Sequence, residues 1–472
     1  MSLHEVVEVV PIDEVGPLHF IAIGGAGMSG IADLYRSAGS TVSGCDRTDS
    51  ATLQQLAATG IDTFVGHDPA HVRDVDTVVV SSAIRADNPE LVAARSLGTR
   101  VWHRSTALAA LMADRVGIAV AGAHGKTTTS AMTAMMLQAA GADPSFVIGA
   151  PLAATGTSSY LGTGPAFVVE ADESDGSFLQ YPTQIAVITN IEPDHLDNWG
   201  NAQAYYEGFV RFATGARVQA VVINVDDAGA RELHDRLRAA GARVVSYGEA
   251  VDADVRLTGL DFEGTHASAT LHFEGHSWPM TLQVPGRYNL ANAAAAFATG
   301  RLLGLDAHQL LAGAAAFTGT LRRFQLVAQL DGMRIYDDYA HHPTELRAAL
   351  GAALRARGEG RLVACFQPHL YSRTRDFADE FGAALCLADV VVVTDVYGAR
   401  EDPIPGVSGA LIADAAQRHA ETSGTQVNYV PNKLDLPAEL AKLAQPGDLI
   451  MTLGAGDVTL VGPMLAGILA SN

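Results

Sequence analysis

The chain alternates short apolar runs with amphipathic stretches through most of its length. Runs typical of buried strands lie at residues 18–23, 40–46, 76–84, 117–121, 166–175, 184–197 and 220–227. The runs at 166–175 and 184–197 each end in a polar loop. Helical patterning follows the first run, at about 29–38, and the fourth run, up to Gly141, a residue type that commonly ends helices. Strands that alternate with helices predict parallel sheets covered by helices.

The pattern changes twice in the second half of the chain. Residues 252–285 contain short alternating runs, such as "ASATLHF", which predict a small antiparallel patch. After residues 321–325 the alternation of strands and helices begins again. At about 150 residues per domain, a chain of 472 residues fits three α/β domains. We place them at 1–112, 113–320 and 321–472.

Composition narrows the class of ligand that this fold could bind. A net charge of −21 with 48% apolar residues describes a globular protein without the basic surface that nucleic acids or anionic membranes require. An anionic ligand must therefore be held locally, by arginine or lysine, by helix N-termini or by metal ions. Three widely spaced cysteines, Cys45, Cys365 and Cys386, favour a reducing compartment and positions in the core.

The start of the chain is acidic, and no apolar run reaches about 18 residues. These features predict a cytoplasmic protein without a signal peptide or a membrane span.

A glycine motif follows the first predicted strand. "GGAGMSG" supplies Gly25, Gly27 and Gly30 in the G-x-G-x-x-G spacing, and Asp46 ends the next strand. Glycines let the backbone approach a diphosphate, and the following helix N-terminus favours its charge. The motif predicts a dinucleotide-type site but leaves NAD, FAD and a UDP-sugar open. A glycine-rich turn without a ligand is the alternative.

A second glycine motif, "GAHGKTTT" at 122–129, follows the strand at 117–121 and begins a helix. Backbone N–H groups and Lys126 can hold phosphates there, while Thr127 or Thr128 can reach a magnesium ion. Only three of the 31 basic residues are lysines, and Lys126 is the only one before residue 433. A flexible ammonium fits between phosphates where a planar guanidinium does not. We therefore predict that Lys126 is functional.

Polar residues follow two further strands. "EADESD" places Glu170 directly after a strand, in position to face magnesium, although a solvated acidic loop would have the same sequence. "TNIEPDHLD" places His195 among acids at the end of another strand, where parallel sheets bind ligands.

Two segments of the third predicted domain are rich in chemically active side chains. "YDDYAHHPTE" at 336–345 holds two tyrosines, two histidines and several acids around a helix start, which is more than a cap requires. "FQPHLYSRTRD" at 366–376 ends a strand with His369, Arg373 and Arg375, which could clamp a carboxylate or phosphate. Both segments lie at strand ends of one domain, which predicts the wall of a cleft.

Together these stretches resemble the Mur ligases of cell-wall precursor synthesis. "PGRYNLANA", "RRFQ", "VYGAREDPIPG" and "LGAGD" extend the resemblance, which runs in order from about residue 21 to 457. It implies a UDP-binding Rossmann-like domain, a central P-loop ATPase domain and a C-terminal Rossmann-like domain that binds the amino acid. It also implies ATP-dependent ligation through an acyl phosphate, with Mg²⁺ or Mn²⁺ as the metal.

The resemblance implies a role for individual residues. Its catalytic set is Lys126, Glu170, His195, Arg323 and His342. Its ATP-binding set is Gly122, Ala123, His124, Gly125, Lys126, Thr127, Thr128, Asn289, Asn292, Arg323 and Asp338, and its metal ligands are Thr127, Glu170 and His195. Its UDP-sugar set is Gly25, Ala26, Gly27, Met28, Gly30, Asp46, Ser81 and Ser82, and its amino-acid set is Tyr339, His369, Arg373 and Arg375.

Within the family, the lysine count favours the branch that adds alanine. Other branches use a carbamylated lysine after the "DHLD" segment, and this chain has no lysine from 127 to 432. The expected partners are UDP-N-acetylmuramate, L-alanine and ATP, without nucleic acid or membrane, for a monomer or homodimer.

Three alternatives stay open from the sequence. A ligase for recycled tripeptide shares most motifs. An NAD-dependent oxidoreductase would leave the phosphate loop unused. A nucleotide-binding protein without catalysis would not need His369 or Arg373.

Overall fold

The computed structural model describes residues 9–25, 27–399 and 401–471. The chain divides into two compact units. The first comprises the described residues up to Thr258, Thr270–Met280 and Ala291–Ala316, and the second comprises Gly259–Ala269, Thr281–Leu290 and the described residues from Phe317 onward.

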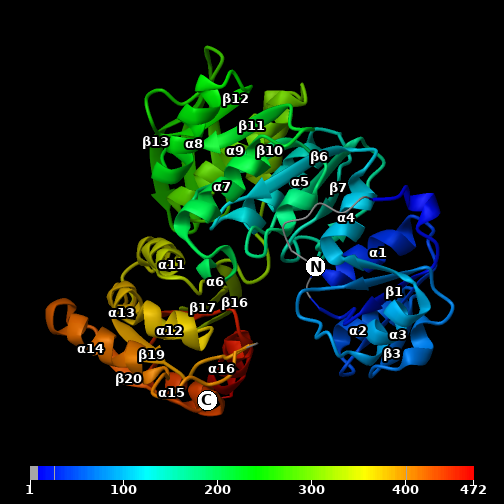
Figure 1. Cartoon of the computed structure of the whole chain (residues 1–472). Helices are drawn as coiled ribbons and strands as arrows, with labels where there is room; N and C mark the ends of the chain where they lie inside the picture. Colours follow the sequence, from blue (N-terminus) through cyan, green and yellow to red (C-terminus); the bar gives the residue numbers. More distant parts are fainter. Residues whose placement is uncertain (1–8, 26, 400, 472) are drawn as a thin grey trace. The chain divides into compact units, whose positions relative to one another are not determined.

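The first sheet, drawn in blue in Figure 1, has five parallel strands in the order β3-β2-β1-β4-β5. Its strands are β1 Leu18–Ile21, β2 Val42–Asp46, β3 Asp62–Val65, β4 Thr77–Val80 and β5 Arg100–His103. Its helices are η1 Ile12–Glu14, α1 Met28–Ser37, α2 Ala51–Ala58, η2 Pro69–Val72, α3 Pro89–Leu97 and α4 Arg104–Met112. Apolar side chains of α1, α2 and α4 cover one face, and those of η2 and α3 cover the other.

The second sheet has ten strands in the order β15-β14-β13-β12-β11-β10-β6-β9-β7-β8. The strands are β6 Val116–Ala121, β7 Ser145–Val147, β8 Ser159–Tyr160, β9 Ala166–Glu170, β10 Thr183–Ile188, β11 Ala220–Asn224, β12 Val244–Gly248, β13 Val255–Glu263, β14 His266–Phe273 and β15 His276–Leu282. The helices are α5 Lys126–Ala139, η3 Ser177–Gln180, α6 Leu196–Trp199, α7 Ala202–Ala213, α8 Ala228–Ala239, α9 Arg287–Leu302 and α10 Ala307–Ala316.

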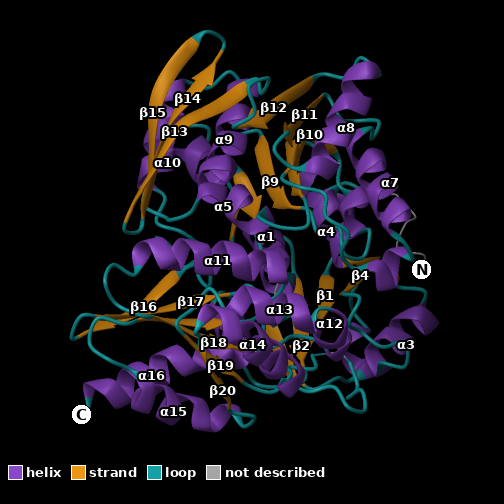
Figure 2. Cartoon of the chain, turned by 90° about the vertical axis from the view of Figure 1, so that its left-hand side faces the viewer, coloured by secondary structure: helices purple, strands orange, loops and turns teal. Residues whose placement is uncertain are grey.

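The run at 252–285 forms β13, β14 and β15, which two-residue turns connect, as antiparallel neighbours allow. β13 pairs with β12, so these strands continue the ten-stranded sheet instead of forming a separate patch. Phe297 of α9 packs against Phe273 of β14 and Trp278 of β15, with ring centroids 6.2 and 5.6 Å away. Figure 2 shows α9 beside these two strands.

The third sheet has six strands in the order β16-β17-β21-β18-β19-β20. Its strands are β16 Gln325–Leu330, β17 Met333–Asp338, β18 Leu362–Phe366, β19 Val390–Val393, β20 Gln426–Tyr429 and β21 Leu449–Leu453. Its helices are α11 Pro343–Ala356, α12 Tyr371–Asp376, α13 Ala378–Leu385, α14 Ala410–Ser423, η4 Lys433–Asp435, α15 Leu436–Leu443, η5 Asp457–Leu460 and α16 Val461–Ala470. Successive residues of β18 alternate between a core with α11, α13 and α14 and a core with α15 and α16.

The three sheets and their helices bear out the predicted three-domain α/β class. Some predicted strands are too long: β1 stops at Ile21 because Ala22 adopts a φ of 60°, and β4 stops at Val80. The domain boundaries at 112 and 320 stay a prediction.

Candidate active site

The phosphate-type loop connects β6 to α5 and depends on two glycines. Gly125 caps α5 with a φ of 84°, in the left-handed region that favours glycine. Gly122 has a φ of 143°, and a Cβ there would lie 2.0 Å from Oγ1 of Thr189. The loop therefore requires glycine at both positions, once for conformation and once for space.

Two residues directly after β10 bind the backbone of the same loop. Asn190 accepts the backbone N–H of His124 at 2.9 Å and donates to the His124 carbonyl at 2.9 Å. The Thr189 hydroxyl also donates to that carbonyl, at 2.6 Å. This pairing fixes the backbone just before Lys126, so the N–H groups at the start of α5 have a defined direction.

Lys126 lies in the first turn of α5, where its ammonium group has three neighbours. Nζ donates to the carbonyls of Gly122 at 2.7 Å and Ala123 at 3.1 Å, and it lies 2.9 Å from Oε2 of Glu173. Burial opposes its charge, but the carboxylates of Glu173, Asp172 and Glu170 raise its pKa above the usual range. Lys126 is therefore a fixed positive charge at a helix N-terminus, which is an anion-binding arrangement.

Glu173 is fully buried and has Lys126 as its cationic partner among the described ion pairs. Burial raises the pKa of Glu173 to about 7, against the attraction of Lys126. Glu173 lies within the "EADESD" stretch, where the sequence pattern indicates no role for it. Its burial is the property that the sequence did not reveal. The indole N–H of Trp199 donates to the backbone carbonyl of Glu173 at 2.9 Å.

Thr127 and Glu170 meet beside the loop. The Thr127 hydroxyl donates to Oε1 of Glu170 at 3.0 Å, and the N–H of Gly149 donates to Oε2 at 2.6 Å. Hydroxyl and carboxylate oxygens are ligands that Mg²⁺ prefers, so this pair fits a magnesium ion. Thr128 lies half-buried in the same helical turn.

His195 lies at the start of α6 with a φ of 53°, and its Nε2 is 3.5 Å from Asp194. His124 of the loop lies 3.0 Å from Glu192 of the same strand-end segment. The segment after β10 thus reaches the phosphate loop.

The first glycine loop lies at the carboxyl end of β1. Gly27 caps α1 with a φ of 80°, and Met28 begins the helix. Asp46, at the end of β2, accepts the N–H of Gly24 at 3.1 Å. A Cβ at Gly30 would lie 3.2 Å from that of Ser159 on β8. Gly25 belongs to the same turn, and Ala26 lies outside the described residues.

Ser81 and Ser82 follow β4 at the same sheet edge. Ser82 donates to Asp175 at 2.8 Å, and its hydroxyl lies 3.0 Å from Nε2 of His103. Asp175 belongs to the acidic loop after β9, so this bond joins the predicted UDP-sugar residues to the loop that carries Glu173.

Arg104 is a residue that the sequence reasoning missed. It begins α4, and its Nη2 lies 3.3 Å from Asp172. Its Nη1 lies 3.3 Å from the position of a Cβ at Gly27. Burial opposes ionisation of Asp172, but the charges of Arg104 and Lys126 hold its pKa at about 2. Arg104 is thus a cation between the first glycine loop and the acidic loop after β9, and only its place after a strand, in "WHRST", could have indicated it.

The two asparagines of "YNLAN" lie on α9. Asn292 is buried, and its Oδ1 lies 3.1 Å from the position of a Cβ at Gly125. Asn289, which belongs to the second unit, is buried and donates to the Pro285 carbonyl at 2.7 Å.

In the second unit, Asp338 ends β17 and holds the adjacent turn. Its carboxylate accepts the N–H groups of Phe324 at 2.7 Å and Ala340 at 2.8 Å. Burial raises the pKa of Asp338 to about 6, against the charge of Arg323. The Arg323 guanidinium lies over the Tyr339 ring, 5.1 Å from its centroid.

The remaining predicted residues lie near the starts of two helices. His342 caps α11, and its ring lies 5.3 Å from that of Phe377. His369 stacks with Tyr397 at 6.0 Å and lies 5.6 Å from His341.

The two arginines of α12 differ in exposure. Arg373 is 7% exposed, whereas the side chain of Arg375 is 54% exposed and donates to Asp376 at 2.7 Å. The interior position belongs to Arg373, which makes it the better candidate for a carboxylate clamp.

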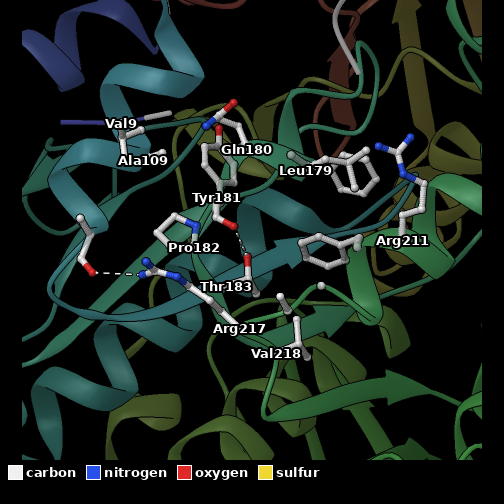
Figure 3. A pocket seen from close by; sticks show the side chains of 15 residues that line it. Val9, Ala109, Leu179, Gln180, Tyr181, Pro182, Thr183, Arg211, Arg217 and Val218 are labelled. Atoms are coloured by element: carbon white, nitrogen blue, oxygen red, sulfur yellow. Dashed lines mark hydrogen bonds between the residues drawn. The ribbon is translucent and has the colours of Figure 1, made fainter. Parts of the chain in front are cut away.

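A cavity of about 530 Å³ lies elsewhere in the first unit, between α4, η3 and α7 (Figure 3). Tyr181, Arg211 and Arg217 line it, and Arg217 donates to the Ala113 carbonyl at 3.4 Å. Its lining in the described chain includes no predicted site residue.

Comparison with known families decides the classification. The Mur ligase family catalytic domain matches residues 17–116, the Mur ligase middle domain matches 120–300, and the Mur ligase glutamate ligase domain matches 322–456. The chain belongs to the Mur ligase family. It is therefore a ligase.

Individual Mur ligases are similar over the full length. UDP-N-acetylmuramate–L-alanine ligase of Cutibacterium acnes is 62% identical over 471 residues, covering 99% of each chain. The enzyme of the same name from Kineococcus radiotolerans is 51% identical, covering 98% of each chain. The crystal structure of UDP-N-acetylmuramate–alanine ligase from Thermotoga maritima has a TM-score of 0.81 at 29% identity, covering 96% of this chain and 99% of that one.

Within the described residues of this Mur ligase, no helix has both the length and the apolar character that crossing a membrane requires.

Proposed function

We propose that this Mur ligase joins L-alanine to the carboxylate of UDP-N-acetylmuramate, with ATP converted to ADP and phosphate. The observation that carries the proposal is the 62% identity, over 99% of each chain, to a ligase named for these two substrates. The phosphate loop supports the proposal independently, because Lys126 at the start of α5 gives a ligase a positively charged site for a nucleotide.

The first half of the reaction activates the acid. Lys126 holds the β- and γ-phosphates, together with the N–H groups at the start of α5. Thr127 and Glu170, with His195, would hold the magnesium ion, which supplies neutralisation of phosphate charge. A carboxylate oxygen of the muramyl group attacks the γ-phosphorus, ADP leaves, and an acyl phosphate forms. The site would accelerate this step by positioning the reactants and by stabilising the charge on the transferred phosphate.

The second half forms the amide. The alanine amine attacks the acyl carbon, phosphate leaves, and the amine loses a proton. Tyr339, His369 and Arg373 are proposed to bind alanine, with buried Arg373 pairing with its carboxylate. Asn289, Asn292, Arg323 and Asp338 are proposed for the nucleotide, and His342 for catalysis.

The UDP-sugar is proposed to occupy the carboxyl edge of the first sheet. The glycine loop, Asp46, Ser81 and Ser82 lie there together, as dinucleotide sites of open sheets do. Arg104 extends that site toward Asp172 and can face the sugar diphosphate or the muramyl carboxylate.

A ligase for a recycled peptide is the second candidate within the family. The murein peptide ligase of Psychrobacter arcticus has a TM-score of 0.69 at 25% identity, over 97% of this chain. The identity to ligases named for alanine is much higher, at 62% and 51%, so alanine is the substrate that we propose.

Release of ADP from the purified protein tests the proposal. We expect ADP only when UDP-N-acetylmuramate, L-alanine, ATP and Mg²⁺ are all present, and a product heavier than UDP-N-acetylmuramate by one alanyl residue in the mass spectrum. Replacement of alanine by L-Ala-γ-D-Glu-meso-diaminopimelate should give no product. ADP release that is indifferent to alanine, or turnover of the tripeptide instead, would overturn the assignment.

A further inference from the structure

A cluster of nitrogen, sulfur and carboxylate groups lies in the first sheet, on the face away from the glycine loop. It comprises His19 of β1, Cys45 of β2, His67 after β3, His71 of η2 and Glu90 of α3. Cys45 and Asp46 are consecutive on β2, so their side chains point to opposite faces. Asp46 faces the glycine loop, and Cys45 faces the core under η2 and α3. The cluster therefore has no part in the proposed reaction.

The groups of this cluster converge on the Glu90 carboxylate. Oε2 lies 2.8 Å from Sγ of Cys45, and Oε1 lies 2.7 Å from Nδ1 of His71 and 3.5 Å from Nε2 of His19. One donor atom from each of His19, Cys45, His71 and Glu90 lies within 4.8 Å of every other. Four donors from separate elements thus surround one point.

The interior position of these groups is unusual for their chemistry. His19, Cys45 and Glu90 are fully buried, and the side chain of His71 is 16% exposed. The Phe64 ring stacks on His71 at 4.1 Å and fixes its plane. A buried carboxylate with several imidazoles is a costly arrangement unless its partners balance the charge.

The hydrogen bonds of His19 determine where its lone pair points. The Ser43 hydroxyl donates to the Leu18 carbonyl at 3.3 Å, and its oxygen lies 2.9 Å from Nδ1 of His19, where it can accept a hydrogen bond from that atom. A proton on Nδ1 leaves Nε2 as an unprotonated acceptor in the neutral ring. That atom is buried without a hydrogen-bond partner and faces a carboxylate oxygen, which is also an acceptor. In that tautomer, a metal ion between the two atoms, which lie 3.5 Å apart, would give both of them a partner.

We propose that this cluster is a zinc site, with Nε2 of His19, Sγ of Cys45, Nδ1 of His71 and a Glu90 oxygen as ligands. Nitrogen, sulfur and oxygen donors in this number suit tetrahedral Zn²⁺, whereas Mg²⁺ prefers oxygen alone. Metal–ligand bonds of about 2.0–2.3 Å place tetrahedral ligands roughly 3.3–3.6 Å apart. The His19–Glu90 distance of 3.5 Å already fits, whereas the contacts of 2.7 and 2.8 Å to Glu90 must lengthen by roughly half an ångström or more.

Proton balance and the surrounding hydrogen bonds agree with this assignment. The Cys45 thiol lies 2.8 Å from Oε2 of Glu90 and would release its proton to solvent on binding the metal. His67 Nδ1 lies 2.9 Å from Oε2 of Glu90 and 3.2 Å from Sγ of Cys45, where it can donate to a ligand atom. Ser43 contacts Nδ1, the ring nitrogen of His19 that does not bind the metal, and so orients the ring.

Four protein ligands leave no open position, so the site is structural. It ties β1, β2, η2 and α3 together behind the proposed UDP-sugar loop. The inference does not depend on the proposed substrates, because the ligands lie on the opposite face of the sheet.

Cobalt substitution tests the site, because a Co²⁺–thiolate bond gives a charge-transfer band that the magnesium site cannot give. We expect the chelator-treated full-length protein to bind one Co²⁺ with this band and with intense visible bands of tetrahedral geometry. Zn²⁺ should abolish both. Cys45→Ser should lose the thiolate band, and Cys386→Ser, which changes a cysteine outside the cluster, should keep it.

Zinc affinity and stability complete the test. In competition with a chromogenic chelator, we expect at least tenfold weaker Zn²⁺ binding for His71→Gln, whose partly exposed side chain favours a folded variant. One equivalent of Zn²⁺ should raise the Tm of the wild type but not of His71→Gln. A wild-type protein without the thiolate band, an unchanged band in Cys45→Ser, or equal zinc affinity in His71→Gln would each overturn the proposal.

Discussion

Lys126 and Glu173 show at the scale of the residue how one ion pair can prepare a binding site. Lys126 has two carbonyls and a carboxylate within 3.2 Å, so its ammonium is already held at the place where we propose that a phosphate binds. Glu173 is the partner that a phosphate would replace. Because Glu173 is buried, its negative charge would become costly if Lys126 turned toward a phosphate.

The raised pKa of Glu173 predicts a particular pH dependence of stability. Its pKa is about 7 in the folded protein, against an ordinary value of 4.5. Between these values the folded state binds more protons than the unfolded chain, so the contribution of Glu173 to stability falls as pH rises from about 4.5 to about 7. Glu173→Gln removes this titration. We therefore expect urea unfolding without magnesium or nucleotide to favour the wild type over the variant more at pH 5 than at pH 7.5.

The matched control is Glu232→Gln, at an exposed carboxylate on α8. It makes the same change of charge without the buried pair, and its difference from the wild type should be nearly constant over this pH range. A constant difference for Glu173→Gln as well would contradict the raised pKa.

At the scale of the element, the segment after β10 connects the phosphate loop to the start of α8 through hydrogen bonds. Its Thr189 and Asn190 hold the phosphate loop, and its next residue, Ile191, donates its N–H to Asp227 at 3.0 Å. Asp227 is also the N-cap of α8, where it accepts the N–H of Ala230 at 2.8 Å. One carboxylate thus fixes both a helix start and the segment that carries His195.

This double role predicts two consequences for Asp227→Ala. Loss of the cap should lower the free energy of unfolding by about 1 kcal/mol, as for other N-caps. Loss of the bond to Ile191 should also lower the rate of ATP-dependent ligation. Urea unfolding and steady-state ADP release measure the two effects.

Asn201→Ala provides the control, because Asn201 caps α7 through the N–H of Ala204 at 2.9 Å. It should lose similar stability but keep its turnover. Equal turnover in both variants would show that the Asp227–Ile191 bond does not position the site.

At the scale of the whole molecule, the proposed chemistry is divided among domains. The glycine loop and Asp46 belong to the first sheet, and Lys126 and Glu170 to the second. Arg104–Asp172 and Ser82–Asp175 join these two parts of the first unit. Tyr339, His369 and Arg373 belong to the second unit.

The division of roles predicts the outcome of Lys126→Ala. Ligation should fall by about a hundredfold or more, because the charge on the transferred phosphate loses its main partner. UDP-N-acetylmuramate should still bind, because its proposed site lies on another sheet. ADP release and isothermal titration calorimetry measure the two properties.

Lys442→Ala is the control, since this lysine has a 68% exposed side chain on α15. It should change neither property. A folded Lys126→Ala protein that no longer bound the UDP-sugar would refute the division of roles.

The sequence by itself determined the features that depend on local order along the chain. Apolar periodicity gave the α/β class, because a strand or helix has a fixed period. Glycines with a lysine marked the phosphate loop, because a turn that binds phosphate needs backbone freedom and a flexible charge. Glu170 and Lys126 followed from such rules, and their ligand contacts remain predictions.

The tertiary structure decided what depends on which distant segments meet. The Lys126–Glu173 pair spans 47 residues, the Arg104–Asp172 pair spans 68, and the proposed zinc ligands lie between residues 19 and 90. The tertiary structure buries Glu173 and Arg373 but leaves Arg375 exposed. No periodicity encodes these contacts. They exist because strand order in a parallel sheet brings the ends of non-consecutive strands together, and because packing then removes some charged groups from water and leaves others in it.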